Sequence, residues 1–264
     1  MHRRQWIEIH EQTWFPRVLR DLTTNTLQFV WNFFDFYGPV VSPLRDALQE
    51  VRTNRVLDLC SGGGGPWLSL ARRFESSEKF PLEVCLTDIF PNADAPQPGS
   101  DGAKVLFHPD PVDATKVPAD LQGFRTLFTC FHHFSPEDAK AILEDAVIQG
   151  QGIGIFEVPR RNALTVILAV FMPLAAFALG PFMRPFRWSR MLWTYVVPVV
   201  PFVVWFDGVI SCLRAYTPPE LNALTKGPTG NRYHWESGET RWGRMPARVT
   251  YLIGYPHCEI MSPK

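Results

Sequence analysis

Short apolar runs alternate with stretches of helical period along most of this chain. The apolar runs predict seven strands, at 56–59, Leu82–Thr87, Lys104–His108, Thr126–Cys130 and Gly152–Val158, then at Arg232–Glu236 and Arg248–Gly254. Alternation of strands with helices is typical of an α/β fold whose sheet is mostly parallel. The polar, Gly-containing segment between the last two strands predicts a closing antiparallel hairpin.

Helical segments begin at favourable capping positions. Apolar residues recur at helical spacing in Pro16–Tyr37, which ends before Gly38-Pro39. Four further helices are predicted to start at Ser42-Pro43, Pro66, Ser135-Pro136 and Thr217-Pro218, because proline is favoured in the first helical turn. The segment 91–102 is too rich in Pro, Gly and Asp for a helix and predicts a loop.

An apolar insert interrupts this alternation after the fifth strand. Ala163–Met183 and Met191–Phe206 contain no charged residue, and Arg184, Arg187 and Arg190 lie between them. Prolines in both runs would interrupt spanning helices, and a spanning hairpin would carry its arginines across the bilayer. Insertion into a membrane surface, a wall of a hydrophobic substrate site and a dimer interface all stay open.

The length allows one sizeable core, because 264 residues are 46% hydrophobic. We therefore predict a main domain at 42–264 that carries a helical insert at 162–206. The segment 1–41 precedes it as a helical lid, or as helices that merely pack on the sheet.

Charge and cysteine content narrow the partners and the compartment. The 26 basic and 26 acidic residues balance, with a sequence pI near 7.0, which disfavours nucleic acid as a partner. Five cysteines without a C-x-x-C pair favour a reducing cytosol over a disulfide framework or structural zinc. The start of the chain lacks the apolar stretch of a secretory signal. We expect a cytoplasmic protein, with membrane association through the insert as one option.

The stretch RVLDLCSGGGGPWLSLARRF at 55–74 predicts a strand, a glycine loop and a helix. Such a loop lets a ligand approach the backbone, and the helix start offers unpaired N–H groups. A Walker loop needs Gly-Lys-Ser/Thr, whereas Gly65 is followed by Pro66 and Trp67. A dinucleotide would place its pyrophosphate near the carboxylate of Asp58, which would repel it. Asp58 instead favours a cationic ligand.

The spacing Asp58-x-Cys60-x-Gly62-x-Gly64 resembles motif I of class I S-adenosylmethionine-dependent methyltransferases, with Cys60 in place of the usual first glycine. The resemblance implies a Rossmann-like, seven-stranded, mostly parallel sheet with an antiparallel last strand and helices on both faces. It implies that S-adenosylmethionine is the cofactor. Asp88 lies where an acid meets ribose hydroxyls, and Asp113 resembles the residue that contacts adenine. The complete predicted cofactor set is Asp58, Cys60, Ser61, Gly62, Gly64, Asp88, Ile89, Asp113, Ala114 and Cys130.

Two adjacent histidines follow the fourth strand, where open α/β sheets place their ligands. The string His132-His133-Phe134-Ser135-x-Glu137 resembles the His-Asp-Trp-Ser-x-Glu segment of small-molecule O-methyltransferases, whose first histidine is the base. That resemblance makes His132 the candidate base, with His133 as the alternative. It also makes Glu157 the residue that orients the histidine. No His/Asp/Glu cluster has metal-ligand spacing, so no metal is expected.

These features predict methyl transfer from S-adenosylmethionine to a small hydrophobic acceptor, with oxygen favoured over nitrogen or carbon. One alternative is a membrane-docked or partner-docked protein that keeps the cofactor fold as a sensor or scaffold. Another is a nicotinamide oxidoreductase, which Asp58 disfavours.

Overall fold

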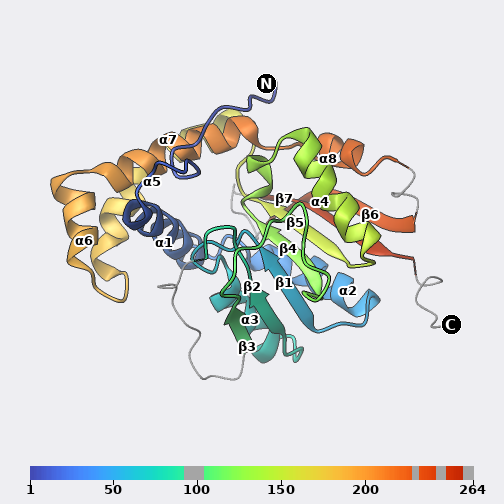
Figure 1. Ribbon diagram of the computed structural model, residues 1–264. Coiled ribbons are helices and arrows are strands. Elements are labelled where there is room, and N and C mark those ends of the chain that lie inside the picture. The colour runs from blue at the N-terminus through green and yellow to red at the C-terminus, as the bar shows by residue number, and fades with distance from the viewer. Residues whose placement is uncertain (92–103, 228–231, 242–247, 258–264) are drawn as a thin grey trace. The chain divides into compact units, whose positions relative to one another are not determined.

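The computed structural model describes residues 1–91, 104–227, 232–241 and 248–257 (Figure 1). The predicted loop at 91–102 therefore lies almost wholly outside the described residues. The chain divides into two compact units, each built from two segments. The helical unit comprises Met1–Asp35 and Pro159–Tyr216, and the sheet unit comprises Phe36–Val158 and Thr217–Lys264.

The sheet unit contains one seven-stranded sheet, with the order β3-β2-β1-β4-β5-β7-β6. Its strands are β1 (Arg55–Leu59), β2 (Glu83–Leu86), β3 (Lys104–Phe107), β4 (Phe124–Phe128), β5 (Ile153–Glu157), β6 (Tyr233–Arg241) and β7 (Arg248–Pro256). The first five are parallel, and β7 runs antiparallel to both β5 and β6. The predicted α/β fold is confirmed, with a seven-stranded, mostly parallel sheet and an antiparallel last strand.

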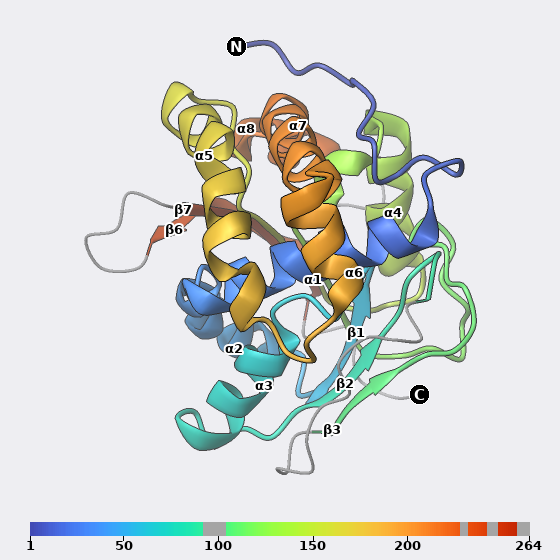
Figure 2. The same cartoon turned by 90° about the vertical axis from the view of Figure 1, so that its left-hand side faces the viewer.

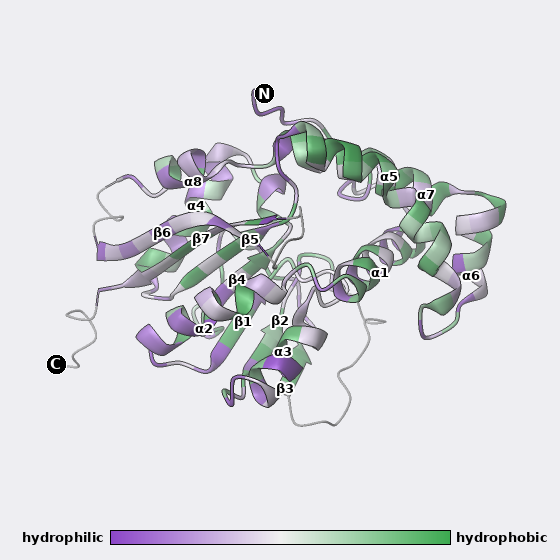
Figure 3. Cartoon of the chain, turned by 180° about the vertical axis from the view of Figure 1, so that it is seen from behind, coloured by the Kyte–Doolittle hydropathy of each residue, from purple (hydrophilic) through white to green (hydrophobic). Residues whose placement is uncertain are grey.

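Helices cover both faces of this sheet (Figures 1 and 3). α2 (Val41–Glu50) and α3 (Trp67–Ser76) lie on one face, and α4 (Pro136–Ile148) and α8 (Pro218–Leu224) lie on the other. The short η1 (Gly38–Val40) precedes α2, and η2 (Phe131–His133) precedes α4. Central β1, β4 and β5 are buried almost throughout because helices cover both of their faces.

Local chemistry explains where these helices begin. Ser135 caps α4 by accepting a hydrogen bond from the Asp138 N–H at 3.1 Å, with Pro136 in the first turn. Thr217 begins α8, and its N–H donates to the Glu220 carboxylate at 2.8 Å, the return bond of a capping box. Both helix starts are where the sequence predicts them.

The helical unit contains the long helices α1 (Arg17–Phe33), α5 (Ala163–Leu179) and α7 (Val199–Arg214). Between α5 and α7 come η3 (Gly180–Phe182), α6 (Trp188–Met191) and the π-helical turn η4 (Leu192–Val196). In Figure 2, α5 and α7 lie side by side, and α1 packs against both. The predicted helical insert between the fifth and sixth strands is confirmed.

The N-terminal strap, residues 3–12, runs along α7 within this unit. The Arg4 N–H donates to the Leu213 carbonyl at 3.1 Å, and the Arg3 guanidinium donates to the Arg214 carbonyl at 2.7 Å. The Arg20 side chain of α1 donates to the carbonyls of His10 and Gln12. The first residues of the chain are therefore attached to helices that lie far away in the sequence.

Candidate active site

The glycine loop leaves β1 through a left-handed turn. Cys60 has φ 58° and Gly64 has φ 104°. Residues other than glycine adopt such positive φ values only with steric strain. The Gly64 N–H donates to the Ser61 carbonyl at 2.8 Å, which closes the turn before α3 begins at Trp67. The loop therefore sits at the carboxyl end of β1 and at the amino end of α3, as predicted.

Asp58 is buried beneath this loop. Its carboxylate accepts hydrogen bonds from the Ser61 and Thr126 hydroxyls, each at 2.6 Å. Burial raises the pKa of Asp58 to about 6, although these hydrogen bonds oppose the rise and the nearby charge of Asp88 adds to it. A cation bound beside the loop would stabilise the ionised carboxylate. The acid therefore both holds the loop and favours a positively charged ligand.

Asp88 ties the end of β2 to the same loop. One carboxylate oxygen accepts the Gly62 N–H at 2.8 Å, and the other accepts the Phe90 N–H at 2.8 Å. The Asp88 carbonyl accepts the Val112 N–H at 3.0 Å, so the segment after β3 also reaches this edge. The glycine loop, Asp88 and the segment that carries Asp113 are thus brought together.

The other predicted cofactor residues differ in exposure. Asp113 is exposed, and its carboxylate accepts hydrogen bonds from the Thr115 N–H and hydroxyl, while Ala114 is buried beside it. Ile89 is exposed. Cys130 is buried and its thiol lies beside that of Cys60; burial and this neighbour raise the Cys130 pKa well above its ordinary value. The contact of each with a cofactor stays a prediction.

The candidate base stands after the carboxyl end of β4. Thr129 adopts φ 48°, which ends the strand and starts the turn into η2. The His132 Nδ1 lies 2.6 Å from Glu157 Oε2, and Glu157 Oε1 accepts the Phe131 N–H at 2.7 Å. Both side chains are buried. An ionised carboxylate can only accept, so Nδ1 carries the proton and Nε2 of a neutral ring carries the lone pair.

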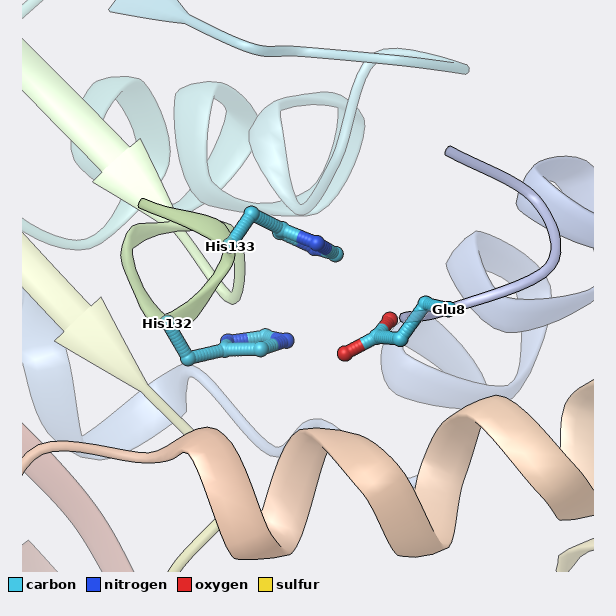
Figure 4. Close-up of side chains that lie close together, drawn as sticks. All are labelled: Glu8, His132 and His133. Atoms are coloured by element: carbon cyan, nitrogen blue, oxygen red, sulfur yellow. The ribbon is translucent and has the colours of Figure 1, made fainter. Parts of the chain in front are cut away.

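His133 lies next to His132 in Figure 4, with ring centroids 4.2 Å apart and planes 33° apart. Both residues belong to η2, whereas Glu8, also labelled there, belongs to the helical unit. His133 is half-buried. The 2.6 Å contact of its ring with the Glu157 carboxylate favours His132 as the oriented imidazole.

The helical unit contains a group of side chains that could hold a metal ion. Ligand atoms of Glu8, His10 and Asp207 lie within 4.8 Å of one another. The Asp207 carboxylate accepts the N–H groups of Ile9 and His10, and the Arg214 guanidinium lies 3.6 Å from Glu8. This arrangement is that of an internal ion network, which attaches the N-terminal strap to α7.

Sequence reasoning missed two side chains of the sheet unit. Thr126 holds Asp58, and the hydroxyl of Tyr37 is hydrogen-bonded to that of Thr129. A signal existed for Thr126, because a polar residue inside a buried strand needs a hydrogen-bond partner. No pattern in the sequence pairs Tyr37 with Thr129.

No family model and no curated protein matches the sequence. Among solved structures, the chain resembles human N-acetylserotonin methyltransferase in complex with S-adenosylmethionine, with 15% identity, a TM-score of 0.48, and coverage of 90% of this chain and 56% of that one. It resembles the methyltransferase domain of bacterial CtHen1-CN, with 9% identity, a TM-score of 0.46, and coverage of 83% and 99%. A proposed Zn-dependent alcohol dehydrogenase from Rhodobacter sphaeroides has 12% identity, a TM-score of 0.41, and coverage of 89% and 98%. Likenesses this distant do not decide an activity.

Proposed function

We propose that this protein transfers the methyl group of S-adenosylmethionine to an oxygen atom of a small, lipophilic acceptor, with His132 as the base. The observation that carries the proposal is the buried contact of 2.6 Å between His132 Nδ1 and Glu157 Oε2. It lies at the carboxyl end of the sheet, where α/β folds bind their ligands.

The residues of the glycine loop fit this cofactor. Asp58 and Asp88 supply two carboxylates at the loop, and no lysine or arginine occurs between Arg55 and Arg72. An acidic set favours the cationic sulfonium and ammonium groups, and it would repel the pyrophosphate of a nicotinamide dinucleotide. Burial raises the pKa of Asp58 to about 6, and a bound cation would oppose that rise by stabilising the ionised carboxylate.

When bound, S-adenosylmethionine supplies a methyl group on a positively charged sulfur. The protein must then hold the acceptor in line and remove its proton. With Nδ1–H donated to Glu157, His132 Nε2 takes the proton from the acceptor hydroxyl, and the ionised Glu157 stabilises the imidazolium that results. Glu157 is itself held by the Phe131 N–H. His132 is thus oriented before the acceptor arrives.

The lipophilic acceptor is supported by the apolar surface of the helical unit. Leu164, Phe171 and Trp188 are among its exposed side chains, and a membrane surface is where lipophilic metabolites collect. We also propose that the protein is cytoplasmic. Cys60, Cys85, Cys130 and Cys212, the cysteines of the described residues, are all free thiols, which suits a reducing compartment.

The cofactor is tested by calorimetry. S-adenosylhomocysteine should bind and raise the melting temperature, since a ligand specific to the folded state stabilises it. Asp88→Ala should weaken binding, because charge-assisted hydrogen bonds contribute roughly 1.5–3 kcal/mol each. NADH is the control. A melting shift with NADH and none with S-adenosylhomocysteine would favour the oxidoreductase.

The base is tested by methyl transfer from labelled S-adenosylmethionine to a panel of small phenols and quinols. His132→Ala should lower kcat by about 10²–10⁴, with S-adenosylhomocysteine affinity unchanged. Glu157→Gln keeps the shape and should lower kcat less. His133→Ala is the matched neighbour: a larger loss there than in His132→Ala would reassign the base. Tight cofactor binding with no transfer to any acceptor would favour the sensor or scaffold.

A further inference from the structure

Helix α5 presents its large apolar side chains outward. Leu164, Ile167, Leu168, Phe171 and Leu174 recur at helical spacing and are between 44% and 63% exposed. By length and composition, Ala163–Phe182 could cross a membrane. Only 17% of its most apolar 18 residues are buried inside the protein, so most of this segment is exposed. Figure 3 shows α5 and the first half of α7 as the most continuous hydrophobic ribbon. These five side chains are called the α5 face below.

Small residues of α5 are the ones buried in the helical unit. The two buried residues of α5 are the small Ala169 and Ala176, and Ala169 lies against Gly208 of α7. Large apolar side chains such as Leu, Ile and Phe are most often buried in water-soluble proteins. Helices that meet through small residues and turn large apolar ones outward are typical of a lipid environment.

The tip that follows α5 carries aromatic side chains beside arginines. Phe182, Phe186 and Trp188 are exposed, with the Phe186 and Trp188 rings in an edge-to-face contact at 5.2 Å. Arg184 is exposed and Arg187 half-buried. Aromatic rings at headgroup level and guanidinium groups at anionic lipid are the pattern of a membrane interface.

The sign of the charge agrees with this pattern. Every charged residue from 160 to 206 is an arginine, at 160, 161, 184, 187 and 190, although the chain as a whole has no net charge. This concentration of positive charge next to the α5 face complements anionic lipid and would not favour a neutral surface.

The same unit argues against a full span. α5 itself has 17 residues, about 25 Å, and reaches the 20 residues of the possible span only together with the 3-10 turn η3. The bent pair Trp188–Val196 and Val199–Arg214 turns by 70°. The second half of α7 is held by polar groups of the N-terminal strap, through Asp207 and Arg214. One face of the unit is suited to lipid and the other is not.

We propose that the α5 face and the tip at 182–188 insert into the interfacial region of an anionic bilayer, so that the protein is a peripheral, monotopic membrane protein. The inserted side chains reach about 5–10 Å into the headgroup and acyl boundary. Arg184 and Arg187 contact lipid phosphates and carboxylates. Docking needs no methyl transfer, so it stands independently of the proposed chemistry.

Arg190 is not part of this surface, despite its place in the same cluster. It is buried, and its guanidinium donates to the carbonyls of Met183 and Pro185 at 3.0 and 3.2 Å. Arg190 therefore holds the tip in shape, and replacing it would confuse a folding defect with lost binding.

The test is flotation of the full chain with two kinds of vesicle. One kind is phosphatidylcholine alone, and the other is phosphatidylcholine with about 30% phosphatidylserine, which mimics a strongly anionic leaflet. Wild type should float with the anionic vesicles. Arg184→Gln with Arg187→Gln should weaken binding by about fivefold for each arginine. Arg72→Gln with Arg232→Gln, two exposed arginines of the sheet unit, should leave it unchanged.

Insertion is tested separately from charge. Phe171→Ser with Leu174→Ser should reduce binding to anionic vesicles, whereas Ile148→Ser, at an exposed apolar position of α4, should not. Brominated lipid should quench tryptophan fluorescence, and Trp188→Phe should remove part of that quenching. A folded, monodisperse wild type that ignores anionic vesicles overturns the proposal. So does a stable dimer, free of vesicles, that is broken by the Phe171 and Leu174 substitutions.

Discussion

Asp58 shows how one buried residue serves the glycine loop. Its carboxylate accepts hydrogen bonds from hydroxyl groups of the loop and of β4. Hydrogen bonds to the charged form partly offset the cost of burying it. The residue therefore stabilises the local structure and remains sensitive to any cation that binds beside it.

This arrangement predicts a specific pH dependence. The folded-state pKa of Asp58, about 6, is above its value in the unfolded chain, so the folded state binds the proton more tightly. Stability contributed by the protonated acid is then lost as the pH rises from about 4 to 6, by up to roughly 3 kcal/mol. Asp58→Asn should remove this loss while its amide still bonds to Ser61 and Thr126.

Urea unfolding of wild type and Asp58→Asn at pH 4, 5, 6 and 7 measures the difference, because other carboxylates titrate in both proteins. The variant should gain stability relative to wild type as the pH rises. Parallel curves would show that Asp58 keeps an ordinary pKa in the folded protein.

The candidate site could be predicted only partly at this scale. The residue types at Asp58, Asp88, His132 and Glu157 follow from the motifs and from their places at strand ends. Their mutual contacts do not, because the Asp58 and Thr126 partners come from strands whose pairing depends on the whole sheet. The sequence identifies which residues face the site, and the fold supplies their distances.

At the scale of elements, the seven strands were predicted at the right places along the chain, with small errors at their ends except at β6. That strand was expected at Arg232–Glu236 and occurs at Tyr233–Arg241. The fourth strand was expected at Thr126–Cys130 and occurs at Phe124–Phe128. Thr129 ends it with a left-handed conformation that β-branched residues seldom adopt, so no propensity signalled it. The start was missed because Arg125 is buried inside the strand, where the Asp145 carboxylate pairs with it at 2.7 Å.

The attachment of the N-terminal strap to α7 is expected to depend on pH through His10. Burial lowers the pKa of His10, but the hydrogen bond to Asp207 and the charges of Glu8, Asp207 and Glu11 outweigh it, so the pKa is raised. Protonated His10 therefore stabilises the strap on α7 fully below the unfolded-state pKa of roughly 6.5. That contribution is lost as the pH rises through the higher folded-state value.

Asp207→Asn should lower stability by roughly 2–3 kcal/mol at pH 6, since it weakens charge-assisted hydrogen bonds from Ile9, His10 and the His10 ring. It should also flatten the decline between pH 6 and 8. The measurement is urea unfolding across that range, with His10→Gln as the control that lacks the titrating ring. An Asp207→Asn curve as steep as that of wild type would exclude the ion pair as its cause.

At the scale of the whole molecule, the chain crosses between the units three times. The segments 1–35 and 159–216 form one unit although more than a hundred residues separate them. Periodicity marks α1 as amphipathic but does not identify its partner. The sequence alone therefore predicted the first 41 residues as a lid or as helices packed on the sheet, and the insert as a separate element. The pairing of α1 with α5 and α7 depends on tertiary packing that no local pattern encodes.

Two units with two proposed ligands should give two separate footprints in hydrogen exchange. S-adenosylhomocysteine should slow amide hydrogen exchange in the sheet unit at 61–64, 88–90 and 112–115, because a bound ligand makes local opening of these loops less frequent. Anionic vesicles should instead slow exchange in the helical unit at 182–196, where lipid would cover turns that water now reaches.

The variants separate these footprints. Asp88→Ala should remove the first and leave the second, whereas Arg184→Gln with Arg187→Gln should do the opposite, as expected for independent sites. A vesicle footprint without a cofactor footprint would leave a membrane-docked protein with no methyltransferase site. A cofactor footprint that vanished in the arginine variant would show that the two units act together, because loss of the lipid surface would then have altered a site in the other unit.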